Sequence, residues 1–267
     1  MSTLAPASTE TLIHSTASIA STAELGAGVR IGPFAVIEDH VVIGAGTVVD
    51  AHAVIRPFVR MGARNRVHTN AVLGGEPQHV DFAGQETGLV IGDDNQFREA
   101  VTVHRSMSPD EPTRIGSRCM LMVNAHVGHD CHLGDRVILT NDVNLGGHVT
   151  AGDGVLMGGM AQVHQFVRVG TCTMVSGSTS LARDALPYSF MWGILARHYR
   201  LNTIGLRRSG IKGERYKALE KAFRALRNGD PIDDLPATEE VCHLKEWLAL
   251  PSKRGLAGFA KRGESAE

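Results

Sequence analysis

The chain has 267 residues, enough to bury a hydrophobic core in one or two domains. Its formal net charge of -1 gives no sign of a nucleic-acid partner, so any acidic ligand must be met by a local basic patch. The first residues lack the basic segment and apolar run of an export signal, and no window approaches the roughly 18 apolar residues of a membrane span, so we expect a cytoplasmic protein without a transmembrane segment.

An aliphatic residue returns at every sixth position from Ile13 through Leu73, a period that fits neither a helix nor an alternating strand. The period resumes in the same phase at Ile91 and again from Ile115 to Leu181. This is the hexapeptide repeat of a parallel β-helix, in which three hexads make one triangular coil of 18 residues. The pattern predicts a β protein, with a left-handed parallel β-helix of about ten coils over residues 1–187.

Two segments, residues 74–90 and 105–113, interrupt the repeat and carry proline, glycine and charge. We expect both to be loops that project from the prism. Loops held on a rigid scaffold are favoured places for ligand contacts.

The unbroken phase from 115 to 181 allows the outward-facing side chains to be placed next to one another. Residue i lies about 4.8 Å from residue i+18, so His129 is expected beside Gly147, and Asp130 beside His148. His164 lies two coils beyond Gly128. The stretch "VNAHVGHDCHLGD" therefore belongs to a polar patch on one line of the prism.

Acyl transfer is one function that this patch can perform. A hydroxyl attacks a thioester only if a base takes its proton, and the imidazole of His129 is suited to that role. Asp130 or a backbone carbonyl would orient the ring, and Gly147 would leave a backbone N–H accessible to the oxyanion. Two alternatives remain open: a zinc enzyme resembling the hexapeptide-repeat carbonic anhydrases, which use three histidines, and a non-catalytic trimeric scaffold.

The chain changes character after Pro187. Two segments, 215–229 and 237–250, carry apolar residues at helical spacing, and Gly229 is placed to end the first helix. We expect residues 188–267 to form a small helical domain that covers one end of the β-helix.

The motifs "NAHVGHDCHLGD", "LGGHV", "GGMAQVHQF" and "LRRSG" resemble those of the UDP-N-acetylglucosamine acyltransferases that begin lipid A synthesis. The resemblance implies a homotrimer with active sites between neighbouring prisms. It also implies a 3-hydroxyacyl donor carried as an acyl carrier protein thioester, a nucleotide-sugar hydroxyl as acceptor, and no metal or other cofactor. By motif match His129 is the base with Asp130 beside it, and Gly147 is the oxyanion glycine. The implied substrate contacts are His126, His148, His164, Gln165, Asn202, Arg208 and, near the acyl tail, Gly177.

The departures from this family lie on the acceptor side. "HVDF" places His79 and Asp81 where the family usually has an aspartate and a lysine, and in "NTIGLRRSG" Ser209 replaces an arginine. The other changed positions are Trp192, Ile194, Leu195 and Ile204. Losing two cations and gaining Asp81 disfavours a pyrophosphate, so we expect UDP-N-acetylglucosamine to bind weakly or not at all. It remains the default acceptor, and the same chemistry on a different acceptor is the alternative.

Overall fold

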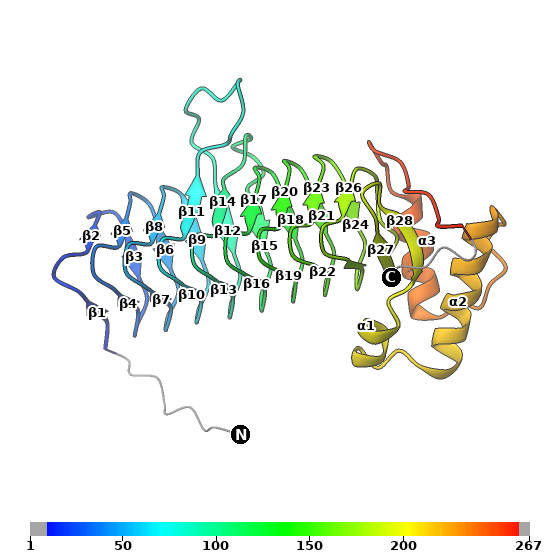
Figure 1. Cartoon of the computed structure of the whole chain (residues 1–267). Coiled ribbons are helices and arrows are strands. Elements are labelled where there is room, and N and C mark those ends of the chain that lie inside the picture. Colours follow the sequence, from blue (N-terminus) through cyan, green and yellow to red (C-terminus); the bar gives the residue numbers. More distant parts are fainter. Residues whose placement is uncertain (1–9, 262–267) are drawn as a thin grey trace.

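The computed structural model describes residues 10–261, and short strands wind through them into a three-sided prism (Figure 1). Three sheets form its faces, and within each sheet the strands of successive coils are parallel, apart from the antiparallel pair β27 and β28. Partners are 18 residues apart wherever no insertion intervenes, as between His126 and Asn144. The left-handed parallel β-helix predicted from the hexad period is thereby confirmed.

The strands are distributed over the three faces as follows. Sheet A contains β1 (Leu12–Ile13), β4 (Arg30–Ile31), β7 (Val48–Val49), β10 (Arg66–Val67), β13 (Gln96–Phe97), β16 (Met120–Leu121), β19 (Ile138–Leu139), β22 (Leu156–Met157), β25 (Met174–Val175), β27 (Ser189–Trp192) and β28 (Arg197–Leu201). Sheet B contains β2 (Ser18–Ile19), β5 (Val36–Ile37), β8 (Val54–Ile55), β11 (Val72–Gly75), β14 (Thr102–His104), β17 (His126–Val127), β20 (Asn144–Leu145), β23 (Gln162–Val163) and β26 (Ser180–Leu181). Sheet C contains β3 (Glu24–Leu25), β6 (Val42–Ile43), β9 (Val59–Met61), β12 (Leu89–Ile91), β15 (Thr113–Ile115), β18 (His132–Leu133), β21 (Thr150–Ala151) and β24 (Arg168–Val169).

The repeated aliphatic residue of each hexad forms the core of the prism. Ile37, Ile55 and Leu73 stack on successive coils of sheet B and are almost fully buried. The chain then turns a corner, and the third residue after the aliphatic one adopts a left-handed conformation, as at Asp130 (φ 58) and His148 (φ 60). Each hexad buries two side chains, the aliphatic residue and the one four positions later, as at Ile37 and Val41, and leaves the corner residues available at the surface.

Two insertions interrupt the coils. One loop, residues 76–88, joins β11 to β12 and projects from the prism in cyan (Figure 1). The second, residues 105–112, joins β14 to β15. Both loops lie within the predicted interruptions, and the flanking strands extend into those ranges by one or two residues.

The helical region covers the C-terminal end of the prism. It contains α1 (Thr203–Arg208), α2 (Gly213–Asn228) and α3 (Glu239–Ala249), and Gly229 ends α2 in a left-handed conformation as expected. Leu219 and Phe223 of α2 share a second hydrophobic core with Leu186 and Tyr188 from the end of the solenoid. Sheet A runs beyond residue 187 because β27 adds to β25, and β28 folds back on β27. Within residues 10–261, no helix combines the length and apolar character needed to cross a membrane.

Candidate active site

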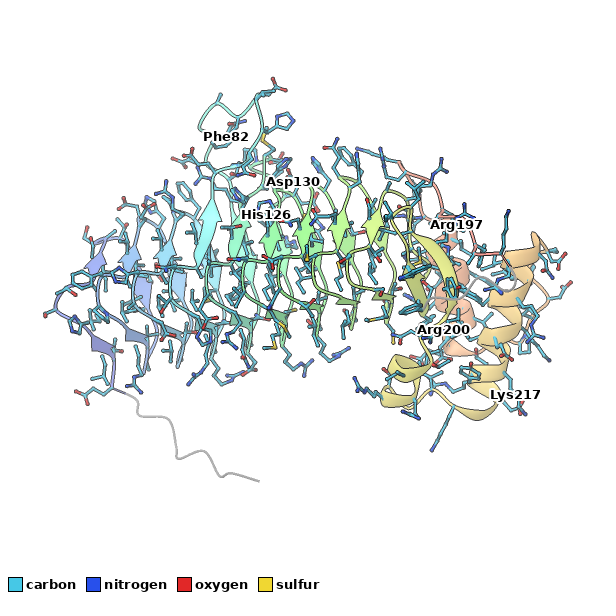
Figure 2. The ribbon with its side chains drawn as sticks, in the orientation of Figure 1. Phe82, His126, Asp130, Arg197, Arg200 and Lys217 are labelled. Atoms are coloured by element: carbon cyan, nitrogen blue, oxygen red, sulfur yellow. The ribbon has the colours of Figure 1, made fainter. Side chains whose placement is uncertain are left out.

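The corner between sheets B and C brings the predicted polar residues together. His129, Gly147 and Gln165 each follow a sheet B strand by two residues, so they stack on consecutive coils beyond β17, β20 and β23. Beside them is a cleft of ≈ 360 Å³, next to the labelled His126 and Asp130 (Figure 2). Its lining residues are Gln78, His79, His104, His126, Gly128, His129, Gly146, Gly147, Val163, His164 and Gln165.

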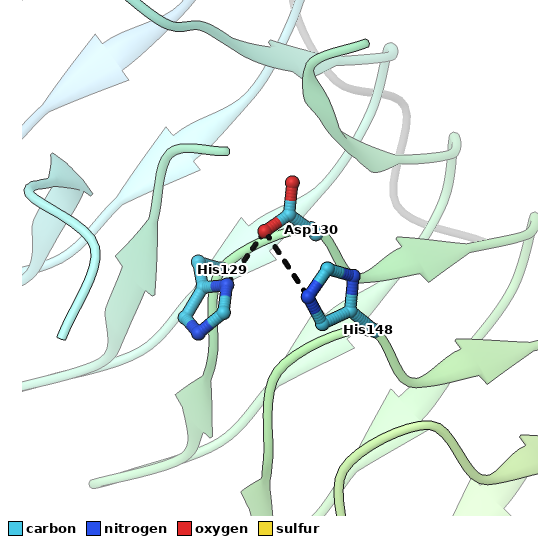
Figure 3. A group of neighbouring side chains, drawn as sticks. All are labelled: His129, Asp130 and His148. Atoms are coloured by element: carbon cyan, nitrogen blue, oxygen red, sulfur yellow. Dashed lines mark hydrogen bonds and ion pairs between the residues drawn. The ribbon is translucent and has the colours of Figure 1, made fainter. Parts of the chain in front are cut away.

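A short hydrogen bond joins His129 to Asp130 at this corner (Figure 3). The His129 Nδ1 and Asp130 Oδ2 atoms are 2.6 Å apart, and the two side chains are only 9% and 12% exposed. An ionised carboxylate can only accept, so Nδ1 carries the proton and Nε2 is left with a free lone pair. His129 therefore has the tautomer that a general base requires.

The second loop holds the carboxylate of Asp130 in place. The backbone N–H of Met107 donates to both carboxylate oxygens, at 3.1 and 3.2 Å. The backbone N–H of Asp130 donates to Thr113 Oγ1 at 2.8 Å, and the Thr113 side chain is buried at the start of β15. Asp130 is thus fixed from two directions by residues outside its own coil.

Gly147 packs directly against the ring of His129. A Cβ atom at this glycine would lie 2.7 Å from His129 Nε2, which is closer than any side chain tolerates. Among residues 10–261, no backbone carbonyl accepts a hydrogen bond from the Gly147 N–H. The cleft therefore contains an unpaired backbone donor next to the free nitrogen of the base.

His148 completes the cluster on the far side of Asp130. Its Nε2 is 3.7 Å from Asp130 Oδ2 (Figure 3). Its ring stacks on that of Phe166, with the ring centres 4.5 Å apart. Burial is the main cause that lowers the pKa of His148, and the attraction of Asp130 opposes it. The predicted placement of Asp130 between two histidines is confirmed.

A second pair of imidazoles lines the other wall of the cleft. His126 Nδ1 is 2.9 Å from Thr102 Oγ1, and its ring contacts that of His104 at 5.1 Å. His104 Nδ1 donates to the backbone oxygen of Glu76 at 2.5 Å. Burial lowers the pKa of His126 to about 4, with repulsion from His104 adding to the effect, and burial also lowers the pKa of His104. Both rings are neutral near pH 7 and can exchange hydrogen bonds with a hydroxylated ligand.

His104 and His79 were not predicted as site residues. The ring of His79 lies 5.5 Å from that of His129 and comes from the projecting loop. His79 lies within the first insertion and His104 immediately precedes the second, so the 18-residue stacking rule applies to neither. The sequence signals were their positions in and next to predicted ligand-contacting loops and, for His79, its place in the changed acceptor motif "HVDF".

The remaining predicted site residues do not line this cleft. Gly177 lies at the corner between sheets A and B, where a Cβ atom would approach the backbone oxygen of Gly159. Asn202 caps α1 by accepting from the Gly205 N–H at 3.0 Å, and Arg208 is exposed at the end of that helix. Asp81 projects from the first loop with its side chain 82% exposed, beside His79.

The other positions at which the acceptor motifs differ from the family lie at the end of β27, between β27 and β28, and at α1. Ile194 and Leu195 are strongly exposed between β27 and β28, and Ile204 is half exposed on α1. Trp192 ends β27, and Ser209 is the C-terminal cap of α1. None of these side chains lies on the His129 corner of the same chain.

His129, Asp130 and His148 are the described residues that could best hold a metal ion, because their ligand atoms lie within 4.8 Å of one another. Ligands of tetrahedral zinc at bond lengths of 2.0–2.1 Å are separated by about 3.3 Å. The 2.6 Å between His129 Nδ1 and Asp130 Oδ2 is shorter and matches a charge-assisted hydrogen bond. The observed distance is that of a hydrogen bond between an imidazole and a carboxylate.

Other hollows on the prism lack this chemistry. One of ≈ 390 Å³ lies over β1, β4 and β7, where its titratable side chains are His14, Arg30 and Asp50. It contains no paired imidazole and carboxylate with a free glycine N–H beside them. We therefore assign the candidate active site to the His129 cleft.

Two protein-family models match the chain. The model described as UDP N-acetylglucosamine O-acyltransferase, domain 2, covers residues 184–260, and a bacterial transferase hexapeptide model with six repeats covers residues 112–150. These matches correspond to the helical region and to the coils that carry His126, His129 and His148.

Whole-chain comparisons point to the same group. A Paraburkholderia phymatum protein named acyl-(acyl-carrier-protein)-UDP-N-acetylglucosamine O-acyltransferase is 45% identical over 224 residues, covering 83% of this chain and 86% of its own. A Bartonella henselae protein of the same name is 41% identical and covers 91% of this chain and 93% of its own. The structure of LpxA from Acinetobacter baumannii superposes with a TM-score of 0.84 at 33% identity, over 92% of this chain and 99% of that one. This chain therefore belongs to the UDP-N-acetylglucosamine O-acyltransferase family.

Proposed function

We propose that this protein transfers a 3-hydroxyacyl chain from acyl carrier protein to a sugar hydroxyl, by default the 3-hydroxyl of UDP-N-acetylglucosamine in lipid A synthesis. The observation that carries the proposal is the His129–Asp130 pair with the unpaired N–H of Gly147 beside the His129 ring. The names and structures of the relatives support the donor and the acceptor. Acyl carrier protein as donor also supports a cytoplasmic location.

The proposed reaction begins when His129 Nε2 takes the proton of the acceptor hydroxyl. The hydroxyl oxygen attacks the thioester carbonyl and forms a tetrahedral intermediate, whose oxyanion accepts a hydrogen bond from the Gly147 N–H. The intermediate collapses, the C–S bond breaks, and the imidazolium returns the proton to the departing sulfur. Asp130 stabilises the imidazolium in between, without taking its proton. The neutral rings of His104 and His126 are placed to orient the acceptor.

The mechanism needs no metal ion, because each proton transfer and the developing charge have a partner among the residues described. Metal analysis of the purified protein tests this part of the proposal. Zinc bound at one ion per chain, with turnover lost on chelation and regained on adding zinc, would contradict it.

A homotrimer with active sites between chains is part of the same proposal. The assigned substrate contacts fall on two separate regions of one chain: the corner between sheets B and C, and a second region at Gly177, Asn202 and Arg208. A single acceptor and its acyl chain can meet both sets only if a second copy of the chain supplies one of them. In a closed ring of three chains, each contact joins two different surfaces, so the first region of one chain can meet the second region of its neighbour.

Turnover by the variant His129→Ala provides the test. With a 3-hydroxyacyl carrier protein and UDP-N-acetylglucosamine, we expect thiol release to fall by about a thousandfold, because a general base contributes on that scale. The matched control is His132→Ala, since His132 lies on sheet C outside the cleft and pairs only with Glu111. Undiminished turnover by His129→Ala, with a normal thermal unfolding midpoint, would overturn the base assignment.

The acceptor itself needs a separate screen. The exposed Asp81 favours the alternative of a less anionic acceptor, because its carboxylate lies beside His79, which lines the cleft, and would repel an approaching pyrophosphate. Initial rates with several nucleotide sugars and unsubstituted sugars, at a fixed donor concentration, distinguish the two. A preference for an acceptor without a diphosphate would support the alternative.

A further inference from the structure

Two cations lie at the C-terminal end of the corner that carries the active site. Arg183 follows β26 by two residues, exactly the relation that His129, Gly147 and Gln165 have to their own strands. It is therefore the next member of the same column, three coils from His129, or about 14 Å at the usual strand spacing. Its side chain is exposed.

Lys253 reaches the same corner from the other end of the chain. Its Nζ lies 4.1 Å from the centre of the Phe166 ring, which in turn stacks on His148. Burial is the main cause of the lowered pKa of His148, and the charge of Lys253 adds to that effect. The positive charge of Lys253 therefore acts electrostatically on His148, a member of the His129–Asp130–His148 cluster.

The segment that carries Lys253 is held firmly against the solenoid. Figure 1 shows it in red, returning from α3 to the prism near β26. Arg254 Nε donates to the Ala182 oxygen at 3.1 Å, and the Asp184 N–H donates to the Gly255 oxygen at 2.9 Å. The two cations are therefore carried by paired backbone segments, and the Arg183 side chain lies against Gly255, two residues from Lys253, where an added Cβ atom would be 3.8 Å from Arg183 Nη1.

Neither cation is neutralised by a neighbour. Within residues 10–261, Arg183 and Lys253 form no ion pair, whereas arginines at another corner, such as Arg118 and Arg136, pair with aspartates across the coils. The adjacent acid, Asp184, is buried and already bonded to Arg168 at 2.7 Å. Unpaired cations next to a catalytic cleft are suited to bind a phosphate.

We propose that Arg183 and Lys253 form a subsite for a phosphate group on the substrate whose reacting end lies at His129. The inference rests on the proposed function, because the phosphate belongs to a substrate of that acyl transfer and the two cations are the groups that would bind it. Two substrates of that reaction carry phosphate: the diphosphate of a nucleotide sugar and the phosphopantetheine arm of the carrier protein. A subsite here would also restore the two cations that the acceptor motifs lack at Asp81 and Ser209.

The test compares Arg183→Gln, Lys253→Gln and the double variant with the charge-matched control Arg60→Gln, on the outer face of sheet C. Calorimetry measures the affinity for UDP-N-acetylglucosamine in one arm and for 4′-phosphopantetheine in the other. We expect one of the two ligands to bind roughly tenfold more weakly for each cation removed, and the other to be unaffected. The thermal unfolding midpoint of each variant checks the fold, and Lys253→Gln removes a side chain whose described contact is the Phe166 ring.

The results distinguish a nucleotide-sugar phosphate from a phosphopantetheine phosphate, and they test the subsite separately from the proposed function. Weaker binding of the nucleotide sugar assigns the subsite to the acceptor, and weaker binding of phosphopantetheine assigns it to the donor. Affinities that change no more than in Arg60→Gln, or a wild-type protein that binds neither ligand, overturn the subsite. Charge-dependent binding without any acyl transfer would instead leave the subsite standing and contradict the proposed function.

Discussion

Asp130 has a backbone conformation that most residues avoid. Its φ of 58 lies in the left-handed region, which aspartate and asparagine tolerate better than branched side chains do. The hexad geometry demands that conformation at the corner, and it directs the carboxylate sideways to its own neighbour, His129. Other coils place residues as different as Phe58 and Met160 at the same turn position, so the turn tolerates Asp130 without requiring it, and we propose that its carboxylate is there to orient His129.

Replacing Asp130 by asparagine tests its role in the base. The amide keeps the turn but can donate a proton to His129 Nδ1, which would move the ring proton to Nε2 and block the attack. We expect kcat to fall by about a thousandfold or more while the unfolding midpoint changes little.

Asp142→Asn is the matched control, because Asp142 occupies the equivalent left-handed turn position (φ 60) at another corner and bonds to Asn124. Equal kcat values for Asp130→Asn and the wild type would show that a backbone group, rather than this carboxylate, orients the ring.

Much of the His129 corner was predictable because the hexads between 115 and 181 contain no insertion. Counting 18 residues is then equivalent to stepping one strand spacing, which correctly paired Asp130 with His148 and His129 with Gly147. The contribution of Met107 could not be found in this way, because a backbone N–H in an irregular loop leaves no side-chain pattern. Lys253 was missed because its contact with Phe166 joins distant segments of the chain.

Among the elements, β28 connects the solenoid to the C-terminal segment through one buried side chain. His198 is fully buried, its Nε2 accepts from the Leu186 N–H at 2.8 Å, and its Nδ1 donates to the Ala257 oxygen at 2.9 Å. Both ring nitrogens are used only if the ring is neutral. Burial accordingly lowers the pKa of His198 to about 4.

This burial predicts a loss of stability in mild acid. Between about pH 6.5 and pH 4 the unfolded chain binds a proton at this histidine that the folded chain does not bind. The stabilisation is therefore fully present above pH 6.5 and decreases as the pH falls towards 4. We expect a lower guanidinium midpoint at pH 5 than at pH 7.5.

The variant His198→Gln isolates this contribution, because glutamine has both a donor and an acceptor but does not titrate. The difference between its midpoints at the two pH values should be smaller than in the wild type. An unchanged difference would assign the acid sensitivity to other histidines with a lowered pKa, such as the half-buried His104 or His126.

The helices that have an amphipathic stripe, α2 and α3, were predicted from the sequence, and α1 was not. The pattern of α2 and α3 indicated both helices, and Gly229 indicated the end of α2. The six-residue α1 is too short to display a period, and its start depends on the Asn202 side chain. β28 is antiparallel and outside the hexad phase, so its pairing with β27 had no signature in the repeat.

At the scale of the whole molecule, sites shared between chains have a measurable consequence. If His129 of one chain meets Arg208 of the next, trimers containing both His129→Ala and Arg208→Ala chains include some sites with neither change. Each mixed trimer would have one intact site in three, so about a third of the sites remain intact once tandem purification has removed the unmixed trimers.

We therefore expect co-expressed, differently tagged variants to recover activity that neither has alone, measured as thiol release after tandem purification. Light scattering of the same sample gives the number of chains. Mixed assemblies as inactive as the separate variants would show that both residues act within one chain, or that Arg208 is not needed.

The constant 18-residue register also determines which changes in length the molecule tolerates. Deleting one residue from a coil would turn its inward aliphatic side chains towards water, because neighbouring positions on a strand face opposite sides. Deleting a complete coil from the N-terminal part, far from His129, would leave the strands of every remaining coil paired in register with those of the next coil. Relatives of this protein should therefore differ in prism length by whole coils. The geometry of the corner that contains His129 should be the same in longer and shorter prisms.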